Sequence, residues 1–162
     1  MKKAKRTARK AKVSRAKPAK KRPVPAIQRA KEFRVSHATN SDFDAGLRGY
    51  FEYRDLGIKG ATRGKVVSHI IRARSGEAPH GEWHWHDCEV QFVYVLKGWA
   101  KFEYEGVGEV LMQAGTCFYQ PPGIRHRETG HSEDLEMMEV VAPGNFKTSC
   151  LEWRTNFCSG SE

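Results

Sequence analysis

The stretch of sequence that decides the fold starts at His84-Trp85-His86 and runs on through Gln91-Phe92-Val93-Tyr94-Val95-Leu96-Lys97-Gly98. A second part follows at Pro121-Pro122-Gly123-Ile124-Arg125-His126. Because side chains alternate between the two faces of a strand, the imidazoles of His84 and His86 point the same way. Two such imidazoles and a third, held just after a rigid turn, can form a facial metal site with open positions. The sequence therefore predicts a site for chemistry on a small molecule.

Short β-prone segments separated by turn residues surround this stretch. We expect strands at residues 65–73, 84–86, 90–96, 99–104, 109–112, 116–120 and 135–142, with a further strand around 150–154. Glycine and proline turns separate them, and no long amphipathic helix interrupts the series. Residues 33–60 are expected to lead into the domain through loops and short strands. This pattern predicts an all-β sandwich or barrel.

The positive charge of the chain is concentrated at its beginning. Residues 1–31 contain fourteen Lys and Arg and no acidic residue, and subtracting them from the net charge of +9 leaves residues 32–162 at −5. Such a segment buries too little apolar surface to offset its ordering entropy, so we expect a disordered tail. It has no apolar core of a secretory signal. Its function is either a loose, non-specific contact with a polyanion such as nucleic acid or that of a solubilising arm.

The length of 162 residues favours one folded domain. We expect a tail at 1–31, a β-domain at 32–157 and a loose C-terminus at 158–162. The four cysteines form no C-x-x-C pair, which excludes a zinc ribbon or a thioredoxin-like motif. No apolar run is long enough for a transmembrane helix, so no membrane contact is expected. With no secretory signal, we expect a reducing, cytoplasmic location.

The two histidine-bearing segments together resemble the two motifs of the cupin family. The first motif, G-x5-H-x-H-x3,4-E-x6-G, reads here Ala78-x5-His84-Trp85-His86-x4-Gln91-x6-Gly98. The second, G-x5-P-x-G-x2-H-x3-N, reads Gly115-x5-Pro121-Pro122-Gly123-x2-His126-x3-Gly130. The resemblance covers residues 65–143. It implies an all-β, single-domain cupin jelly-roll β-barrel carrying the disordered basic tail, and a homodimer.

The resemblance also implies a metal site made by His84, His86, His126 and the residue at the fourth position, Gln91. The family usually has glutamate there, and the amide oxygen of Gln91 can bind a metal but brings no charge. A divalent ion would then keep its full charge and act as a stronger Lewis acid. Glu89 has the same strand parity and is an alternative to Gln91, because a local bend can shift the parity. The ligand types suit Fe, Zn, Ni or Cu, and Mn less well. A barrel that has lost its metal is the other interpretation.

Three more residues are candidates for the cavity. Tyr119 and Arg125 flank the second motif, and Arg125 could bind a substrate carboxylate through both arms of its guanidinium. His69, on the strand expected at 65–73, could act as a base. Alternatively, Arg125 lies on the rim and His69 is a solvated or core residue.

By resemblance, the leading hypothesis is a metal-dependent enzyme of the dioxygenase, isomerase or lyase type. Its substrate would be a small oxygen-rich or carboxylated molecule. The neutral ligand set favours Lewis-acid chemistry, while oxygenase chemistry stays open. The alternative is a non-catalytic cupin that binds or senses a small molecule while its basic tail contacts nucleic acid non-specifically.

Overall fold

The computed structural model describes residues 26–40, 42–46, 48–76 and 81–150. Most of the expected tail and the whole of the expected loose C-terminus lie outside these residues. The chain divides into two units, Met1–Lys31 and Glu32–Glu162. A helix, α1, covers Ala26–Glu32, although we had assigned residues 26–31 to a disordered tail. Ala, Gln, Arg, Lys and Glu dominate its sequence, and these residues have high helix propensity.

Six antiparallel strands form the first sheet, in the order β1-β2-β3-β10-β5-β8. Their bounds are Asp44–Ala45 (β1), Phe51–Asp55 (β2), Val67–Ala73 (β3), Val90–Lys97 (β5), Cys117–Gln120 (β8) and Glu136–Ala142 (β10). The central strand β10 pairs with β3 on one side and β5 on the other. This register sets Glu139 directly opposite His69 and Gln91 opposite Val141. These polar residues thus lie on the central strands of the sheet.

Five strands form the second sheet, in the order β11-β4-β9-β6-β7. Their bounds are His84–Asp87 (β4), Trp99–Tyr104 (β6), Gly108–Gln113 (β7), His126–His131 (β9) and Lys147–Cys150 (β11). His84 pairs with His126 in the β4–β9 ladder, and His86 pairs with Thr148 in the β11–β4 ladder. Two short helical segments, η1 (Ala38–Asn40) and α2 (Ile58–Ala61), complete the described elements.

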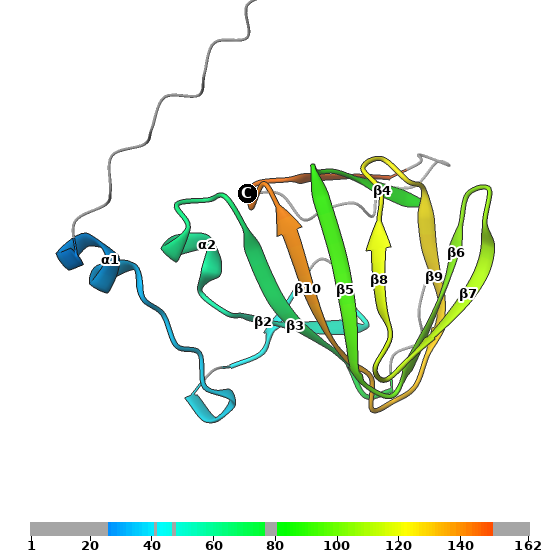
Figure 1. The fold of residues 1–162 in the computed structure, drawn as a ribbon. Coiled ribbons are helices and arrows are strands. Elements are labelled where there is room, and N and C mark those ends of the chain that lie inside the picture. Colours follow the sequence, from blue (N-terminus) through cyan, green and yellow to red (C-terminus); the bar gives the residue numbers. More distant parts are fainter. Residues whose placement is uncertain (1–25, 41, 47, 77–80, 151–162) are drawn as a thin grey trace, which may run out of the picture. The chain divides into compact units, whose positions relative to one another are not determined.

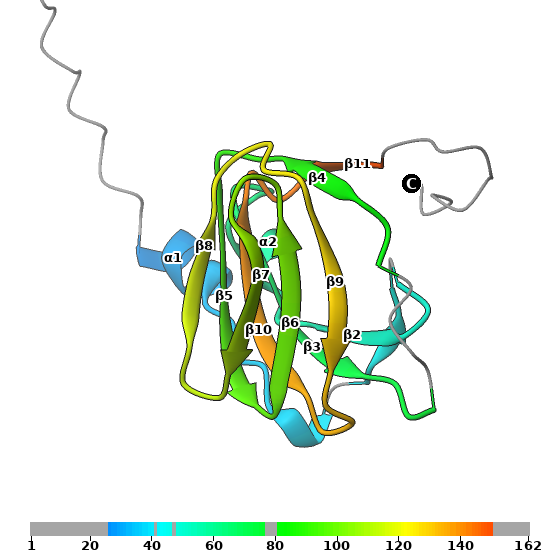
Figure 2. The same ribbon diagram turned by 90° about the vertical axis from the view of Figure 1, so that its right-hand side faces the viewer.

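The two sheets lie as facing layers, a jelly-roll sandwich (Figures 1 and 2). The all-β jelly-roll fold is therefore confirmed. The sheets stay separate in their strand pairing, however, so the ladders do not close into a continuous barrel among the described residues. Apolar side chains from both sheets pack between the layers. Val95, Ala100, Leu135 and Val141 are almost completely buried there.

Most strands fall where the sequence predicts them, including β3 to β8 and β10. The strand β9 was not predicted. Its sequence, His-Arg-Glu-Thr-Gly-His, lacks the apolar and β-branched run that signals a strand. It is held by the neighbours β4 and β6, whose partners make up for its weak local preference. The last described strand, β11, begins at Lys147, earlier than the strand expected around residues 150–154.

The glycine that ends the first motif has a steric reason. Gly98 adopts a positive φ of 67° between β5 and β6, a conformation that side chains with a Cβ rarely adopt. A Cβ at this position would also collide with the hydroxyl of Ser132. The tight connection between the two sheets thus depends on glycine.

None of the described helices has the length and apolar character that a membrane crossing demands. Among the described cysteines, Cys88 is a buried free thiol and Cys117 an exposed one. Cys150 is disulfide-bonded, so the expectation of reduced cysteines does not extend to it.

Candidate metal centre

Three imidazoles from two paired strands meet between the sheets. The ring centroids of His84 and His126 are 4.2 Å apart. The ring centroid of His86 lies 5.1 Å from that of His84 and 5.3 Å from that of His126. One nitrogen of each ring lies within 4.8 Å of the other two. Since an imidazole nitrogen binds zinc at about 2.0–2.1 Å, these three are close enough to share one ion.

Hydrogen bonds fix the direction of each ring. Nδ1 of His84 lies 2.9 Å from the carbonyl oxygen of Glu82, and Nδ1 of His126 lies 3.0 Å from that of Ile124. Nδ1 of His86 lies 2.9 Å from the hydroxyl of Thr148. Each Nδ1 is therefore occupied, and Nε2 is the nitrogen left to bind a metal. Metal-binding histidines are held by such bonds, which fix the tautomer and raise the basicity of the ligand nitrogen.

Burial keeps these three rings neutral. It is the largest cause that lowers the pKa of His84 to about 2, followed by the neighbouring His126 and the charge of Arg48. Burial also lowers the pKa of His86 to about 4, against the opposing effect of Glu139. The pKa of His126 is lowered for the same main reason. Neutral imidazole is the form that binds a metal, so the donor set fits a transition-metal ion.

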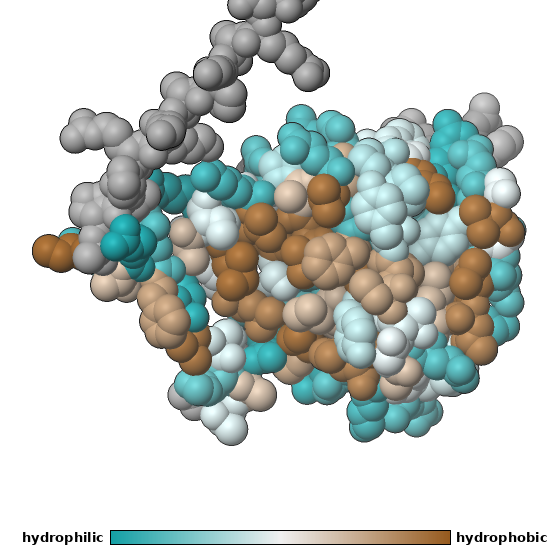
Figure 3. Space-filling model, viewed as in Figure 1, coloured by the Kyte–Doolittle hydropathy of each residue, from teal (hydrophilic) through white to brown (hydrophobic). Residues whose placement is uncertain are grey.

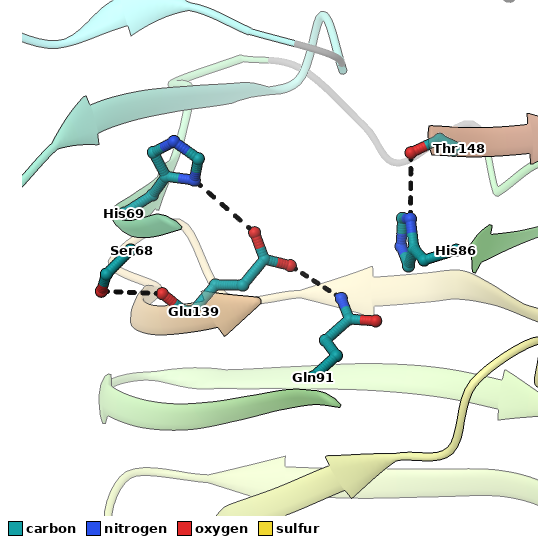
Figure 4. A network of polar contacts seen from close by, with 6 residues as sticks. All are labelled: Ser68, His69, His86, Gln91, Glu139 and Thr148. Carbon is teal, nitrogen blue, oxygen red and sulfur yellow. Dashed lines mark hydrogen bonds and ion pairs between the residues drawn. The ribbon is translucent and has the colours of Figure 1, made fainter. Parts of the chain in front are cut away.

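Gln91 lines the same cavity as the three histidines, and the half-buried carboxylate of Glu139 orients it (Figure 4). Its Nε2 donates a 2.9 Å hydrogen bond to Oε1 of Glu139. An ionised carboxylate only accepts hydrogen bonds, so it must face the NH2 group of Gln91 and leave the amide oxygen on the other side. Figure 4 shows that oxygen on the side where His86 lies. The Gln91 oxygen therefore points away from Glu139.

The carboxylate of Glu139 changes the electrostatics that we expected of this site. Burial alone would raise its pKa, but its contacts with His69, His86 and Gln91 outweigh burial and lower the pKa. A negative charge therefore stands directly behind Gln91. The neutral ligand set expected from the sequence therefore has a carboxylate beside it.

The structure separates the other sequence candidates. His69 lines the cavity, with Nδ1 3.7 Å from Oε2 of Glu139. Glu89 is exposed and does not line the cavity. Tyr119 is 57% exposed on β8. Arg125 is exposed as well, where it pairs with Glu105 at 3.3 Å and does not reach the cavity.

Several polar residues of the cavity were missed by the sequence analysis. Glu128 lies two residues after His126, so the strand parity that pairs His84 with His86 could have found it. Glu139 falls between the buried Met137 and Val141 of β10, which is the same kind of signal. Arg48 lies in a turn before β2, and no local pattern marks it.

The cavity itself has a volume of about 720 Å³, within the range of small-molecule sites. Its apolar lining includes Ile71, Val93, Phe102 and Met137 from both sheets. The polar groups described above share it, together with Arg48 and Glu128. A mostly apolar cavity with a few convergent polar groups is typical of a binding or active site.

Comparison with known proteins agrees with this architecture. No curated protein sequence matches the chain. Three of the solved structures that resemble it are each 16% identical to it. The polyketide cyclase RemF from Streptomyces resistomycificus has a TM-score of 0.61, with 75% of this chain and 87% of RemF covered. KdgF from a Halomonas species has a TM-score of 0.55, with 67% and 94% covered. Streptomyces Pac13, described as a nucleoside dehydratase, has a TM-score of 0.52, with 70% and 88% covered. At this identity, the likeness shows the fold alone.

The family comparison covers both histidine motifs. The family model described as Cupin domain matches residues 73–141, which hold all three histidines and Gln91. The jelly-roll sandwich and the two motifs agree with that match. Residues 73–141 are therefore a cupin domain.

Proposed function

We propose that this cupin holds one divalent transition-metal ion (Fe, Zn, Ni, Mn or Cu) and is an enzyme acting on a small oxygen-rich or carboxylated substrate. The ligands would be Nε2 of His84, His86 and His126 and the amide oxygen of Gln91. One observation carries the proposal. Three neutral imidazoles, each anchored through Nδ1, direct their free nitrogens toward one another beside a 720 Å³ cavity.

A bound ion supplies Lewis acidity, which polarises a carbonyl or enolate oxygen of the substrate. The protein's own part is to orient the ligands and to accept or donate a proton. His69 is the residue we propose for proton transfer, because it lines the cavity and lies beside the carboxylate of Glu139. A histidine next to a carboxylate is a common arrangement for a general base.

We propose chemistry without net oxidation, such as isomerisation or elimination. Neutral ligands favour a Lewis-acid role, and the structural neighbours include a cyclase and a dehydratase. The oxygenase branch has a direct test. Uptake of molecular oxygen by the iron-loaded protein with any oxygen-rich substrate would contradict chemistry without net oxidation. Turnover without oxygen uptake would support it.

Elemental analysis of untagged protein tests the centre. We expect close to one metal ion per chain in the wild type and loss of that ion in His86→Ala. The exposed His37→Ala is the matched control and should retain the metal. If the wild type holds no metal after loading with each candidate ion, the metal-dependent proposal fails. Ligand binding without turnover would then support the alternative, a binding or sensing protein.

We also propose a homodimer through the outer face of the six-stranded sheet. Figure 3 shows hydrophobic side chains gathered over β10, β5 and β8 on this face. Tyr94, Leu96 and Tyr119 are 38%, 45% and 57% exposed there. Large exposed apolar patches commonly mark interaction surfaces. Sedimentation of the purified protein at micromolar concentration tests the assignment.

For the basic tail, we propose non-specific contact with a polyanion. Its fourteen cations and lack of acids support this. A chain lacking residues 1–25 keeps helix α1 whole and should lose DNA retention at low salt. Absence of retention by the full chain would contradict the proposal.

A further inference from the structure

Arg48 is a half-buried cation that forms no ion pair within the described part of the chain. It lines the same cavity as the three histidines. One of its terminal guanidinium nitrogens is buried and forms no hydrogen bond. Buried charges are normally paired, because removing a charge from water is costly. An unpaired guanidinium in a cavity therefore points to a ligand that supplies the missing acceptor.

The two carboxylates that line this cavity are already engaged elsewhere. Oε1 of Glu128 lies 2.7 Å from Nδ1 of His131. Glu139 accepts the hydrogen bond from Gln91 and faces His69. Neither carboxylate is within ion-pair distance of Arg48 in the described part of the chain. The charge of Arg48 is nevertheless felt at the metal centre, where it adds to burial and His126 in lowering the pKa of His84.

The cavity also holds an unsatisfied acceptor. Oε2 of Glu128 is buried and has no partner at hydrogen-bonding geometry in the described structure, while Tyr50 lies beside the same carboxylate. Glu128 as a whole is only 3% exposed. Arg48 and Glu128, which carry these two unpaired atoms, both line the cavity beside the metal site. A buried polar group left unpaired costs about 1–3 kcal/mol, so a ligand that pairs both groups would gain affinity and selectivity.

We propose that this part of the cavity recognises a hydroxylated carboxylic acid, with its carboxylate on the guanidinium of Arg48 and a hydroxyl donating to Oε2 of Glu128. The assignment rests on the proposed function, because it names the substrate class of that same centre. It moves carboxylate recognition from Arg125, the candidate from the sequence, to Arg48.

The charges in the cavity favour a carboxylate over a phosphate. Guanidinium geometry matches both groups. A phosphate monoester carries about 1.5 to 2 negative charges at neutral pH, and Glu128 and Glu139 line the same cavity. A carboxylate brings a single charge, which Arg48 can balance, and Glu128 and Glu139 repel it less than they repel a phosphate monoester. The cavity volume of about 720 Å³ has room for a six-carbon acid.

Calorimetric titration of the full chain, metal-loaded and chelator-treated, tests this inference with three matched six-carbon probes. Gluconate has a carboxylate and hydroxyls, sorbitol has only hydroxyls, and hexanoate has only the carboxylate. We expect gluconate to bind most tightly. Arg48→Gln should weaken gluconate at least about tenfold, as expected for a lost charge-assisted hydrogen bond, and leave sorbitol unchanged. Arg48→Lys should restore part of the affinity.

Arg125→Gln is the matched control and should bind gluconate as the wild type does. Equal gluconate affinity in Arg48→Gln and wild type would overturn the inference, as would sorbitol binding as tightly as gluconate. Failure of gluconate to bind the metal-loaded chain at millimolar concentration would also overturn it and leave the proposed metal centre standing. Inorganic phosphate binding more tightly than gluconate, in an Arg48-dependent way, would replace the carboxylate by a phosphate. If the chain holds no metal but binds gluconate through Arg48, the proposed function fails and this inference stands.

Discussion

The metal-free protein should lose much of its stability between pH 7 and pH 5, because its buried histidines resist protonation. The pKa of His84 is about 2 and that of His86 about 4 in the folded protein, against 6.5 for an unperturbed histidine. As the pH falls through 6.5, the unfolded chain takes up protons that the folded chain does not. Stability therefore falls with pH, since the unfolded state binds more protons.

The magnitude follows from the same linkage. A histidine neutral in the folded state and titrating at 6.5 in the unfolded state costs about 2 kcal/mol of stability between pH 7 and pH 5. His84 and His86 together give about 4 kcal/mol, and His126 adds in the same direction. Their exposed fractions are 7%, 8% and 2%, so solvent screens them little. Burial raises the pKa of Glu128, which offsets part of the loss. We expect a net loss of about 2–4 kcal/mol, a large share of the 5–15 kcal/mol typical of folded domains.

Urea unfolding of chelator-treated protein at pH 7, 6 and 5, followed by tryptophan fluorescence, measures this loss. His84→Asn should reduce the loss by about 2 kcal/mol, because one resisting group is gone. His37→Asn, at an exposed position, should leave it unchanged. A wild-type loss well below 1 kcal/mol, or equal losses in wild type and His84→Asn, would refute the reasoning that burial holds these rings neutral.

Further outcomes follow from the contacts of the site. Zinc binding at pH 6, measured calorimetrically in buffers of different ionisation enthalpy, should release almost no protons, since the three imidazoles are already neutral; release of one or more protons would contradict this. Thr148→Val should weaken metal binding about 10- to 100-fold by removing the anchor of His86, and an unchanged affinity in a metal-competition titration would show that the anchor is dispensable. Gln91→Glu alone should weaken manganese binding, because two carboxylates would meet at hydrogen-bond distance. The double variant Gln91→Glu with Glu139→Gln should bind manganese at least as tightly as the wild type. Equal manganese affinity of the single and double variants would argue against the contact between residues 91 and 139. Tyr119→Lys should shift the sedimentation of a dimer toward monomer, and an unchanged sedimentation coefficient would place the interface elsewhere.

The sequence was sufficient for the fold because the two motifs carry both the turns and the strand parity. His84 and His86 share a face for a reason that any strand obeys. The positive φ of Gly98 and its close approach to Ser132 explain why the motif ends in glycine. These are local rules, so they can be read without the structure. The polar strand β9 has no such local signal, and its neighbours in the sheet determine it.

The polar lining of the cavity depends on contacts between distant parts of the chain. Glu139 is 48 residues from its hydrogen-bond partner Gln91, and Thr148 is 62 residues from His86. Only the register of the ladders brings these groups together. Arg125 was a candidate for substrate binding because it precedes His126 in the sequence, but its side chain is exposed and does not line the cavity. Arg48 reaches the cavity from a segment whose sequence suggested only a loop.

The pairing of Gln91 with Glu139 explains how the centre can lack the family's glutamate ligand and still contain a carboxylate. A carboxylate bound directly to a metal would neutralise half of a divalent charge. Here the carboxylate accepts a hydrogen bond from the amide of Gln91 instead, which polarises the amide and would make its oxygen a better donor to a metal. A divalent ion held by neutral ligands would keep its full formal charge. The carboxylate of Glu139 behind Gln91 would lower the cost of burying that charge. Arg48 adds a further cation to the same cavity. The net charge that a ligand would meet beside a bound ion is therefore positive. That net charge favours a substrate that brings its own negative charge.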